Sequence, residues 1–347
     1  MNFDATVGPR CLVTGGAGYL GEHLCKALVG AGCHVRSLDR VPSEHPGVEA
    51  LVADIRDANA VRSACADIDV VFHAAAMMSF VGIAPRAERE AIWSVNVDGT
   101  RNVIDACRAE GVGRLVYTSS ANVVIDAEIL EADESAPYAA TFVDLYGPSK
   151  AEAERQVLAA NGDDLGTVAL RPGGLWGPGR GGFMIAAFLE QLAQDRFVAS
   201  IGDGTAVVDN THIHNLVRAE LLAAVALLER PKQVGGRPFF ITDEERINGI
   251  EWFRPIAEGL GYDFPTRSLP GSLAYGIAWL SEVAYWMGGP VPTLTRIGVL
   301  KLTRGSSFVN HQARAELGYE PVLRRDEGVA LHLDDYRALL EQLKAGS

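Results

Sequence analysis

The sequence has few cysteines and a shortage of positive charge, and each scarcity argues against a class of protein. Five cysteines occur in 347 residues, and no two of them form a C-x-x-C pair. Because an odd number cannot pair completely, we expect no full disulfide framework, and a reducing cytoplasm suits the chain better. The 44 acidic residues outnumber the 31 basic ones and leave a formal net charge of −13. This charge argues against a nucleic-acid partner, since neutralising phosphates requires clustered Lys and Arg.

Targeting and low-complexity segments are also lacking. Residues 1–8 are polar and too short for the apolar core of a signal peptide, so we expect a cytoplasmic location. No internal repeat is visible, and we predict no metal site. With 48% hydrophobic and 22% charged residues, the composition is that of an ordinary soluble protein with room for about two domains.

Long uninterrupted hydrophobic runs are lacking too, although residues 268–295 come close. Glu282 is the only charged residue of this stretch, and Trp279 and Trp286 stand among many apolar side chains. Interruptions by glycine, by serine and by the Gly-Gly-Pro at 288–290 make it a poor membrane-spanning helix. A buried helix of a small lobe is the first interpretation. The alternatives are a wall of an apolar substrate site or a peripheral anchor at a membrane, because tryptophans and tyrosines suit an interface.

Strand and helix signals alternate through the first half of the chain. Short apolar runs predict strands at 10–13, 34–38, 49–52, 70–73, 114–118, 167–170 and, later, 237–241. Amphipathic stretches predict helices at 18–29, 58–66, 87–109, 147–160 and 216–228. This alternation is typical of an α/β fold, a Rossmann-type doubly wound parallel sheet. We expect a nucleotide-binding domain at 1–174 plus 209–243, and a smaller, mainly helical substrate lobe at 175–208 plus 244–347.

A glycine-rich turn after the first strand indicates what this domain binds. Residues 14–21 read T-G-G-A-G-Y-L-G, the pattern of a dinucleotide-binding turn. Of its three motif glycines, the first allows a tight turn, the second lets the backbone approach a pyrophosphate, and the third lets the helix pack on the sheet. The helix start then points N–H groups and a positive dipole end at the phosphates. We expect cofactor contacts from Gly15, Gly18, Tyr19, Leu20 and Gly21.

Asp39 ends the second predicted strand and bears on the choice of dinucleotide. A carboxylate at this position accepts hydrogen bonds from the ribose hydroxyls of NAD and would repel the 2′-phosphate of NADP. NAD is therefore the expected cofactor, although a solvated turn residue is the alternative for Asp39. Arg36 and Arg40 keep NADP open, because either guanidinium could pair with a phosphate, and Arg40 is expected beside the cofactor.

Residues after the third and fourth strands are further candidates for cofactor contact. Asp54, followed by Ile55, could reach the adenine amino group with its carboxylate or could instead cap a helix. The small Ala74 and Ala75 let the backbone pass close beneath the ribose and the nicotinamide. His73 precedes them, and we expect it to be a packed structural group, since a lone histidine at a strand end is seldom a catalytic base.

Tyr146 and Lys150 stand four residues apart in a helix-forming stretch, which places both side chains on one helix face. The ammonium of Lys150 is expected to lower the tyrosine pKa from about 10 into a usable range and to hold the nicotinamide ribose. Tyr146 can then remove a hydroxyl proton while hydride leaves for the nicotinamide. A third partner is expected at the end of the fifth strand. Ser120 is the first choice and Ser119 the alternative, because strand alternation turns only one of them inwards.

Together these motifs resemble those of the extended short-chain dehydrogenase/reductase superfamily. Asn96, in S-V-N-V-D-G-T, is similar to the asparagine on the cofactor side of that superfamily. The segment L-R-P-G-G-L-W-G-P-G is similar to another of its motifs and implies that the backbone after Pro172 meets the nicotinamide. Trp176 stands there in place of the more usual tyrosine, which we interpret as a packing change only. Members commonly pair through the two long helices, here 87–109 and 147–160, so a homodimer is implied.

The second half resembles the 3β-hydroxysteroid dehydrogenase group of that superfamily and its bacterial cholesterol-dehydrogenase-like members. Three segments carry this resemblance: I-G-D-G with V-D-N-T-H-I-H-N-L within 201–216, F-F-I-T-D-E at 239–244, and A-E-L-G-Y-E-P with E-G within 315–328. At 246–248 the sequence R-I-N departs from the pattern, in which a proline is commoner. The apolar run at 268–295 agrees with a sterol pocket or with uptake from a bilayer surface.

The resemblance implies NAD-dependent oxidation of the 3β-hydroxyl of a steroid or sterol to the 3-ketone, with Tyr146, Lys150 and Ser120 as catalytic residues. Members of the group also shift a ring double bond or remove a C4 carboxylate, and no residue here points to either step. A sugar-nucleotide epimerase or dehydratase is the alternative, and its diphosphate could be met by the basic residues Arg171, Arg180 and Arg304. A cofactor-sensing regulator is a third hypothesis, disfavoured because both the tyrosine and the lysine are present.

Overall fold

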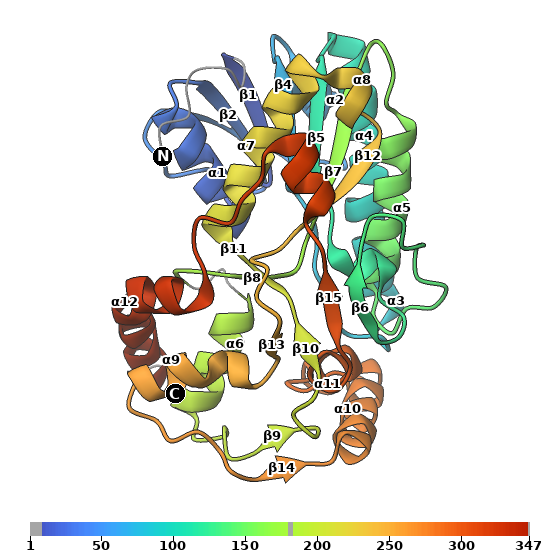
Figure 1. The fold of residues 1–347 in the computed structure, drawn as a ribbon. Helices are drawn as coiled ribbons and strands as arrows, with labels where there is room; N and C mark the ends of the chain where they lie inside the picture. The colour runs from blue at the N-terminus through green and yellow to red at the C-terminus, as the bar shows by residue number, and fades with distance from the viewer. Residues whose placement is uncertain (1–8, 180–182, 346–347) are drawn as a thin grey trace.

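Seven parallel strands form the central sheet of the molecule. The computed structural model describes residues 9–179 and 183–345 and orders these strands β12-β7-β5-β4-β1-β2-β3 (Figure 1). In that order they are Arg237–Ile241, Gly166–Pro172, Arg114–Thr118, Val70–His73, Arg10–Thr14, His34–Asp39 and Val48–Val52. Every neighbouring pair is parallel. The predicted doubly wound sheet is confirmed, including the late strand that returns to it beside β7.

Helices cover both faces of this sheet, which explains why the strands β1, β4, β5 and β7 are buried along nearly their whole length. On one face lie α1 (Tyr19–Gly30) and α7 (Ile213–Glu229), and on the other lie α2 (Ala58–Cys65), α4 (Gly99–Glu110) and α5 (Tyr146–Ala159) (Figure 1). Successive strand residues alternate between the two buried clusters: in β5, Val116 faces α1 and α7, whereas Tyr117 faces the other three helices. None of the five cysteines, all of which lie in the described range 9–179, forms a disulfide, and four of them are buried in these clusters.

The helix predicted at 87–109 is interrupted by one wide turn. α3 (Arg86–Trp93) leads into a π-helical turn at Ser94–Asp98, and α4 follows. Inside this turn the buried Asn96 side chain holds both backbone groups of Met77. Its Oδ1 accepts from the N–H at 2.7 Å, and its Nδ2 donates to the carbonyl oxygen at 2.9 Å. The helix predicted at 87–109 is confirmed, and the π-helical turn within it, which the sequence did not predict, aims Asn96 at a distant loop, as such turns often do at functional sites.

Most of the remaining elements form a smaller lobe, below the sheet in Figure 1. Its helices are α6 (Phe183–Ala193), α9 (Arg254–Gly259), α10 (Gly271–Trp286), α11 (Arg296–Thr303) and α12 (Arg325–Ala345). Its short strands, grouped as they pair, are β13 (Ile247–Asn248), β10 (Val207–Val208), β15 (Ser306–Phe308) and β6 (Ile129–Ala132); β11 (Asn210–His212) and β8 (Gly174–Trp176); β14 (Ser268–Leu269) and β9 (Ser200–Ile201). A mainly helical lobe was expected, and the domain boundaries themselves stay a prediction.

Residues of the family-like segments tie this lobe to the sheet. Asp243, which is 2% exposed, accepts hydrogen bonds from Trp176 Nε1 at 2.7 Å, from Asn215 Nδ2 at 2.6 Å and from the backbone N–H of His212 at 2.9 Å. Asn215 in turn accepts from two backbone N–H groups of the segment that precedes α12. Trp176 was interpreted as a packing change only, and this is incomplete, because its indole N–H also holds the buried Asp243.

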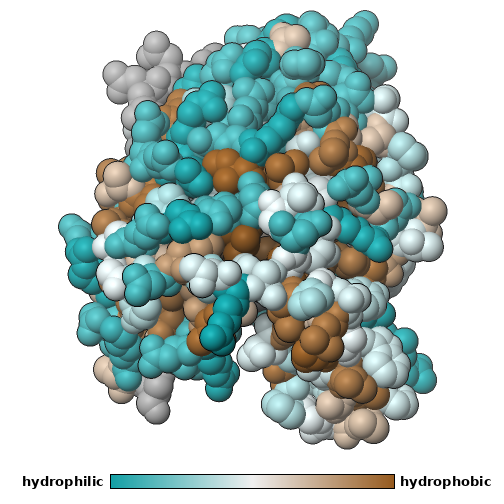
Figure 2. Space-filling model, turned by 60° about the horizontal axis from the view of Figure 1, so that its bottom comes forward, coloured by the Kyte–Doolittle hydropathy of each residue, from teal (hydrophilic) through white to brown (hydrophobic). Residues whose placement is uncertain are grey.

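The apolar run at 268–295 folds mainly into α10, and most of its large side chains are exposed (Figure 2). The residues that are 0% exposed on this helix are Ala274, Ala278 and Glu282, because small side chains let α11 pack closely against it. The interpretation as a buried helix is therefore wrong. We call the exposed side the α10 apolar face; it comprises Leu273 (54% exposed), Ile277 (43%), Trp279 (47%), Leu280 (62%), Trp286 (55%) and Met287 (70%). Within the ranges 9–179 and 183–345, no helix is both long and apolar enough to cross a membrane.

Candidate active site

The turn between β1 and α1 has room only for glycine at two positions. Gly15 has a φ of +72°, and a Cβ there would lie 2.7 Å from the Cα of Ala75. A Cβ on Gly21 would overlap with the carbonyl oxygen of Gly15. Since other residues are strained at positive φ, the first glycine is required by the turn and the third by the close contact of α1 with it.

The start of α1 presents backbone N–H groups to an anion. Gly18 is the N-cap in an extended conformation, and no side chain of the described residues caps the helix. The N–H groups of the first helical turn, at Tyr19 and Leu20, have no partner within the helix, and the helix dipole adds positive potential there. A pyrophosphate fits such a helix start, and a Cβ at Gly15 or Gly21 would fill the cradle behind it. The residues present therefore fit a dinucleotide.

Asp39 lies against this turn at the end of β2. Its Oδ2 accepts a hydrogen bond from the backbone N–H of Ala17 at 3.1 Å, and its Oδ1 accepts from that of Arg40 at 2.6 Å. In folds of this type, the ribose hydroxyls of NAD bind at this strand end. The guanidinium of Arg40 is exposed and stays a candidate neighbour of the ribose.

Arg36 is not available for a phosphate, contrary to one of the two alternatives for NADP. Its Nε donates to Glu49 Oε2 at 3.0 Å, and its Nη1 donates to the carbonyl oxygens of Ala64 and Ala66, both at 2.9 Å. These bonds hold the Arg36 side chain against β3 and the C-terminal end of α2, and away from Asp39. The suggestion is wrong because alternation along β2 turns Arg36 and Asp39 to different surroundings.

Asp54 lies after β3, where its carboxylate pairs with Arg56 at 2.6 Å. This pairing lowers the pKa of Asp54, so its carboxylate is held ionised. Asp54 does not cap a helix, since Asp57 accepts the bonds from the first N–H groups of α2. Ile55 is 5% exposed, and a Cβ on Gly99 would lie 2.6 Å from its Cδ1, so its side chain is packed against α4.

His73 is a structural residue, as expected. It is 0% exposed at the end of β4, with Nδ1 2.6 Å from Thr14 Oγ1 and Nε2 2.9 Å from Thr100 Oγ1. Burial, helped by the charge of Lys150, lowers its pKa to about 3. Both ring nitrogens are engaged, and the chain then continues through Ala74 and Ala75 past the glycine turn.

The candidate catalytic pair lies in the first two turns of α5, beside the end of β5. Tyr146 is the first residue of the helix and is 8% exposed, and Lys150 follows one turn later at 2%. Lys150 Nζ donates to the carbonyl oxygen of Thr118 at 2.7 Å and lies 4.1 Å from the centre of the Tyr117 ring. Burial lowers the pKa of Lys150 to about 7, against the carboxylates of α5 and α7 that raise it.

The expected lowering of the Tyr146 pKa is not found in the chain alone. Burial first, and then the carboxylate of Asp144, raise this pKa. The reason is geometric, because the ammonium of Lys150 is directed at Thr118 instead of the phenol. The ring of Phe80 lies 5.7 Å from that of Tyr146 and screens it further from water.

Ser119 and Ser120 both follow β5, and they differ in their hydrogen bonds. Ser120 is 9% exposed, and its Oγ accepts from the backbone N–H of Asn122 at 3.2 Å, which leaves its hydroxyl proton to donate. Ser119 is 2% exposed, and its Oγ has no partner within the described chain. The choice of Ser120 as the orienting hydroxyl stays a prediction.

The buried pair of Arg171 and Glu154 removes one candidate ligand for a diphosphate. Arg171 Nη2 lies 2.6 Å from Glu154 Oε1, with the two side chains 3% and 0% exposed. Arg171 therefore faces the interior behind Lys150, and the suggestion that it binds a diphosphate is wrong. Arg180 lies outside the described residues, and Arg304 is exposed just after α11.

Two buried acids near the pair were not predicted from the sequence. Glu220 of α7 is 0% exposed, and its Oε1 accepts from Thr118 Oγ1 at 2.6 Å. A signal for it existed, since Glu220 and Arg218 are the only charged residues in the helix predicted at 216–228. Asp144 is 6% exposed and accepts from the backbone N–H of Gly147 at 2.7 Å, and burial raises its pKa. Nothing in the sequence distinguishes Asp144 from an ordinary loop residue.

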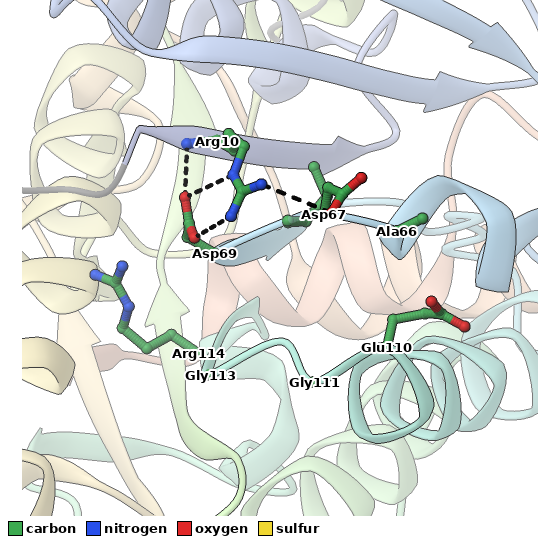
Figure 3. Close-up of a pocket in the computed structure, with 9 residues that line it drawn as sticks. Arg10, Ala66, Asp67, Asp69, Glu110, Gly111, Gly113 and Arg114 are labelled. Atoms are coloured by element: carbon green, nitrogen blue, oxygen red, sulfur yellow. Dashed lines mark hydrogen bonds and ion pairs between the residues drawn. The ribbon is translucent and has the colours of Figure 1, made fainter.

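A cavity of about 540 Å³ opens at the opposite, amino edge of the sheet (Figure 3). Arg10 pairs there with Asp69 at 3.1 Å and with Asp67 at 3.8 Å. Ligands of doubly wound sheets bind at the carboxyl ends of strands, where the glycine turn and α5 lie. We therefore assign no cofactor or substrate to this cavity.

The fold and the site together define a class of protein. A Rossmann-type sheet, a glycine turn that fits a dinucleotide, and Tyr146 and Lys150 on the adjoining helix make the chain an NAD(P)-dependent oxidoreductase of the short-chain dehydrogenase/reductase type. Among solved structures, that of MoeE5 in complex with UDP-glucose and NAD matches with a TM-score of 0.70 and 26% identity, over 95% of this chain and 99% of that one.

The chain belongs to the 3-beta hydroxysteroid dehydrogenase/isomerase family, whose model matches residues 12–271. The 3 beta-hydroxysteroid dehydrogenase/Delta 5-->4-isomerase of Mycobacterium tuberculosis is 37% identical over 343 residues, which cover 96% of this chain and 92% of that protein. Short-chain dehydrogenase/reductase family 42E member 1 of Danio rerio is 41% identical over 334 residues, which cover 90% and 84%. The resemblance drawn from the sequence motifs is confirmed.

Proposed function

We propose that the protein oxidises the 3β-hydroxyl of a steroid or sterol to the 3-ketone and reduces NAD. The observation that carries this proposal is the pair of Tyr146 and Lys150 at the start of α5, beside a turn that fits a dinucleotide, in a chain of the 3-beta hydroxysteroid dehydrogenase/isomerase family. The relative from Mycobacterium tuberculosis is named for the same oxidation and for a double-bond isomerisation.

Each residue of the site has a distinct task in this reaction. NAD, when bound, accepts the hydride from C3 of the substrate. Tyr146, as the phenolate, takes the proton of the 3β-hydroxyl and becomes the neutral phenol. The ammonium of Lys150 favours that phenolate before the transfer and holds the ribose, and Ser120 donates to the reacting oxygen. The products are the ketone, reduced NAD and one proton, which leaves Tyr146 for solvent.

The cofactor is proposed to lie across the carboxyl ends of β1, β2, β4 and β7. Asp39, beside the glycine turn, favours NAD, and the engagement of Arg36 elsewhere removes one support for NADP. The proposed cofactor-binding residues are Gly15, Gly18, Tyr19, Leu20, Gly21, Asp39, Arg40, Asp54, Ile55, Ala74, Ala75, Asn96, Tyr146, Lys150 and Pro172.

A panel of substrates tests the reaction. The purified protein is mixed with NAD or NADP and with 3β-hydroxysteroids, their 3α-epimers or UDP-sugars, and the absorbance of the reduced cofactor is followed. We expect reduction of NAD only with the 3β-hydroxysteroids, and chromatography of the products shows whether a double bond has also moved. Conversion of a UDP-sugar without net cofactor reduction, together with silence on every steroid, would instead support the epimerase alternative.

The proposal extends to a peripheral contact of the α10 apolar face with a lipid bilayer. The face combines exposed leucine, isoleucine and methionine with two exposed tryptophans, the composition of an interfacial anchor. Its inner side reaches the active site, because Glu282 accepts hydrogen bonds at 3.2 Å from the backbone N–H groups of Gly82 and Ile83. Those residues continue the loop of Phe80, which packs on Tyr146, so a steroid leaving a bilayer would arrive beside the catalytic pair.

Co-flotation with phosphatidylcholine vesicles tests this contact. Leu280→Glu should abolish flotation. The matched control is Leu331→Glu, since Leu331 of α12 is 59% exposed against 62% for Leu280 but lies outside the α10 apolar face. Flotation of neither the wild type nor the control would overturn the lipid contact and leave the steroid assay untouched.

A homodimer through the surfaces of α3, α4 and α5 is proposed as well. Trp93 of α3, which is 45% exposed, supports an interface on this side. Analytical ultracentrifugation should show a dimer that Trp93→Glu converts to a monomer. A monomeric wild type at all concentrations would overturn this part of the proposal.

A further inference from the structure

Glu220 is a buried carboxylate with a hydrogen bond recorded to only one of its two oxygens. It lies in the middle of α7, 0% exposed, between the buried Ala219 and Leu221. Its Oε1 accepts from Thr118 Oγ1 at 2.6 Å, whereas its Oε2 has no hydrogen-bond partner in the described part of the chain. A half-satisfied acid in an apolar layer destabilises the fold unless a nearby positive charge compensates it, so its presence calls for a partner.

That positive charge is Lys150, and Thr118 connects the two residues through the sheet. The side chain of Thr118 points to the α7 face, where its hydroxyl bonds Glu220. Its carbonyl oxygen accepts from Lys150 Nζ at 2.7 Å, and Lys150 comes from α5 on the other face. One residue of β5 thus contacts both the acid and the catalytic lysine, from opposite sides of the sheet.

A second buried carboxylate, Glu154, differs in being fully satisfied. It lies one turn after Lys150 on α5 and binds Arg171 through both oxygens, at 2.6 to 3.1 Å. It also accepts from Tyr138 at 2.8 Å. Both carboxylates favour the ammonium form of Lys150, Glu154 more strongly, but the charge of Glu154 is shared with a guanidinium. Glu220 lacks such a competing cation among the contacts that the structure records.

We propose that Glu220 is a positioning residue of the reaction, which keeps Lys150 in its ammonium form through Thr118 from the far face of the sheet. This inference rests on the catalytic role proposed for Lys150. It assigns to α7 a part in the chemistry, although no atom of that helix has to touch substrate or cofactor.

Glu220 is a neighbour of Lys150 whose charge changes near neutral pH. Burial raises its pKa to about 7, whereas burial holds the pKa of His73 at about 3 and raises that of Tyr117 far above its usual value. Glu154 forms an ion pair with Arg171. The titratable groups that surround Lys150 are Tyr146 and Glu154 of α5, Tyr117 of β5, His73 of β4 and Glu220 of α7.

The pH profile of Glu220→Gln therefore tests the inference. Below pH 6 the wild-type carboxyl is itself protonated, so variant and wild type should have kcat/KM values within about twofold of each other. At pH 8 the variant lacks the charge that holds the lysine proton. A fall of about 1 in the lysine pKa would then reduce kcat/KM about tenfold. A structural defect would reduce activity by the same factor at every pH, and that result would overturn the inference.

Two further variants guard against a folding artefact. Glu229→Gln changes the same residue type at the exposed end of the same helix and should keep the wild-type profile. Thr118→Val removes the hydrogen-bond donor to Glu220, so the Glu220 carboxyl ionises at higher pH. The kcat/KM of Thr118→Val should therefore fall at the same pH as that of Glu220→Gln, but by a smaller factor. If Thr118→Val shows no pH-dependent loss, the connection through Thr118 is contradicted.

Titration with NADH separates this inference from the proposed function, because it needs no steroid. Lys150 is expected to hold the ribose, so Glu220→Gln should weaken NADH binding about threefold at pH 8 and leave it unchanged at pH 6. If the wild type oxidises no steroid, the proposed function is overturned, and the NADH titration still decides the role of Glu220. Equal NADH affinities of wild type and variant at both pH values would overturn the role of Glu220.

Discussion

Both edges of the central sheet carry charged residues, but these residues are partly exposed at the amino edge and buried at the carboxyl edge. At the amino edge, Arg10 and Asp69 form an ion pair whose side chains are 48% and 27% exposed (Figure 3). At the carboxyl edge, Lys150 is 2% exposed and Glu220 is 0% exposed. Water screens the first set, so such pairs contribute little, whereas burial brings the pKa values of the second set to about 7.

The difference teaches that the shape of a surface does not locate the chemistry of this fold. The amino edge has a cavity of about 540 Å³, yet it combines exposed ion pairs with the starts of strands. The carboxyl edge has the start of α1, a turn with no room for a Cβ at Gly15 or Gly21, and an acid and a base whose pKa values are about 7. Perturbed groups of that kind cluster at functional sites. Variants at the two edges should therefore behave very differently.

The largest effect is expected from Tyr146→Phe at the carboxyl edge. Loss of a general base typically reduces the rate about 10²- to 10⁴-fold, and kcat should fall within that range. NADH affinity should stay within about twofold, because the phenyl ring keeps its packing against Phe80. Stopped-flow assays and NADH titration measure the two quantities, and a variant with the full oxidation rate would end the mechanism proposed here.

The glycine turn should show the next largest effect. In Gly21→Ala the new Cβ overlaps with the carbonyl oxygen of Gly15, so α1 has to move and the NADH dissociation constant should rise at least about tenfold. The control is Gly30→Ala at the other end of α1, where a Cβ meets nothing within 4 Å. Calorimetry should find NADH binding by this control unchanged; weakening by both variants alike would contradict a specific role of the turn.

His73 should make the free energy of unfolding fall at acid pH, an effect smaller than the two above. Its pKa is about 3 in the folded chain and about 6.5 when unfolded, so only the unfolded chain takes up a proton between these values. Stability is therefore lost as the pH falls below 6.5, by about 1.4 kcal/mol at pH 5.5. In urea unfolding, His73→Asn should lose that much less than the wild type between pH 7.5 and 5.5. Parallel losses would refute this assignment.

The smallest effect is expected at the amino edge. Asp69→Asn removes an ion pair that is substantially exposed, so the free energy of unfolding should change by less than about 1 kcal/mol. The steroid oxidation rate should not change. A loss of activity comparable to that of Tyr146→Phe would erase the distinction between the two edges.

Local patterns in the sequence were sufficient for the sheet and for much of the site. The order of strands and helices, the glycine turn, and the four-residue spacing of Tyr146 and Lys150 depend on contacts between near neighbours in the chain. His73 was also expected to be structural, and Thr14 and Thr100 occupy both of its ring nitrogens. These features needed no knowledge of long-range packing.

The failures have a common cause in contacts between distant residues. The π-helical turn places Asn96 against Met77, which is 19 residues away in the chain, and the large residues of α10 are exposed because small ones pack against α11. Composition alone cannot say which side of an apolar helix is covered. The position of Glu220 behind Lys150 depends on two helices meeting one strand from opposite faces, which spacing in the sequence does not record.

Transfer of a label tests the central claim most directly. A 3β-hydroxysteroid that carries deuterium on C3 is oxidised with NAD, and the reduced cofactor is analysed by mass spectrometry. Direct oxidation predicts one deuterium in the reduced cofactor for each 3-ketone formed. Deuterium retained in the steroid with no net reduction of NAD, or released to water, would contradict hydride transfer from C3 and with it the function proposed for this site.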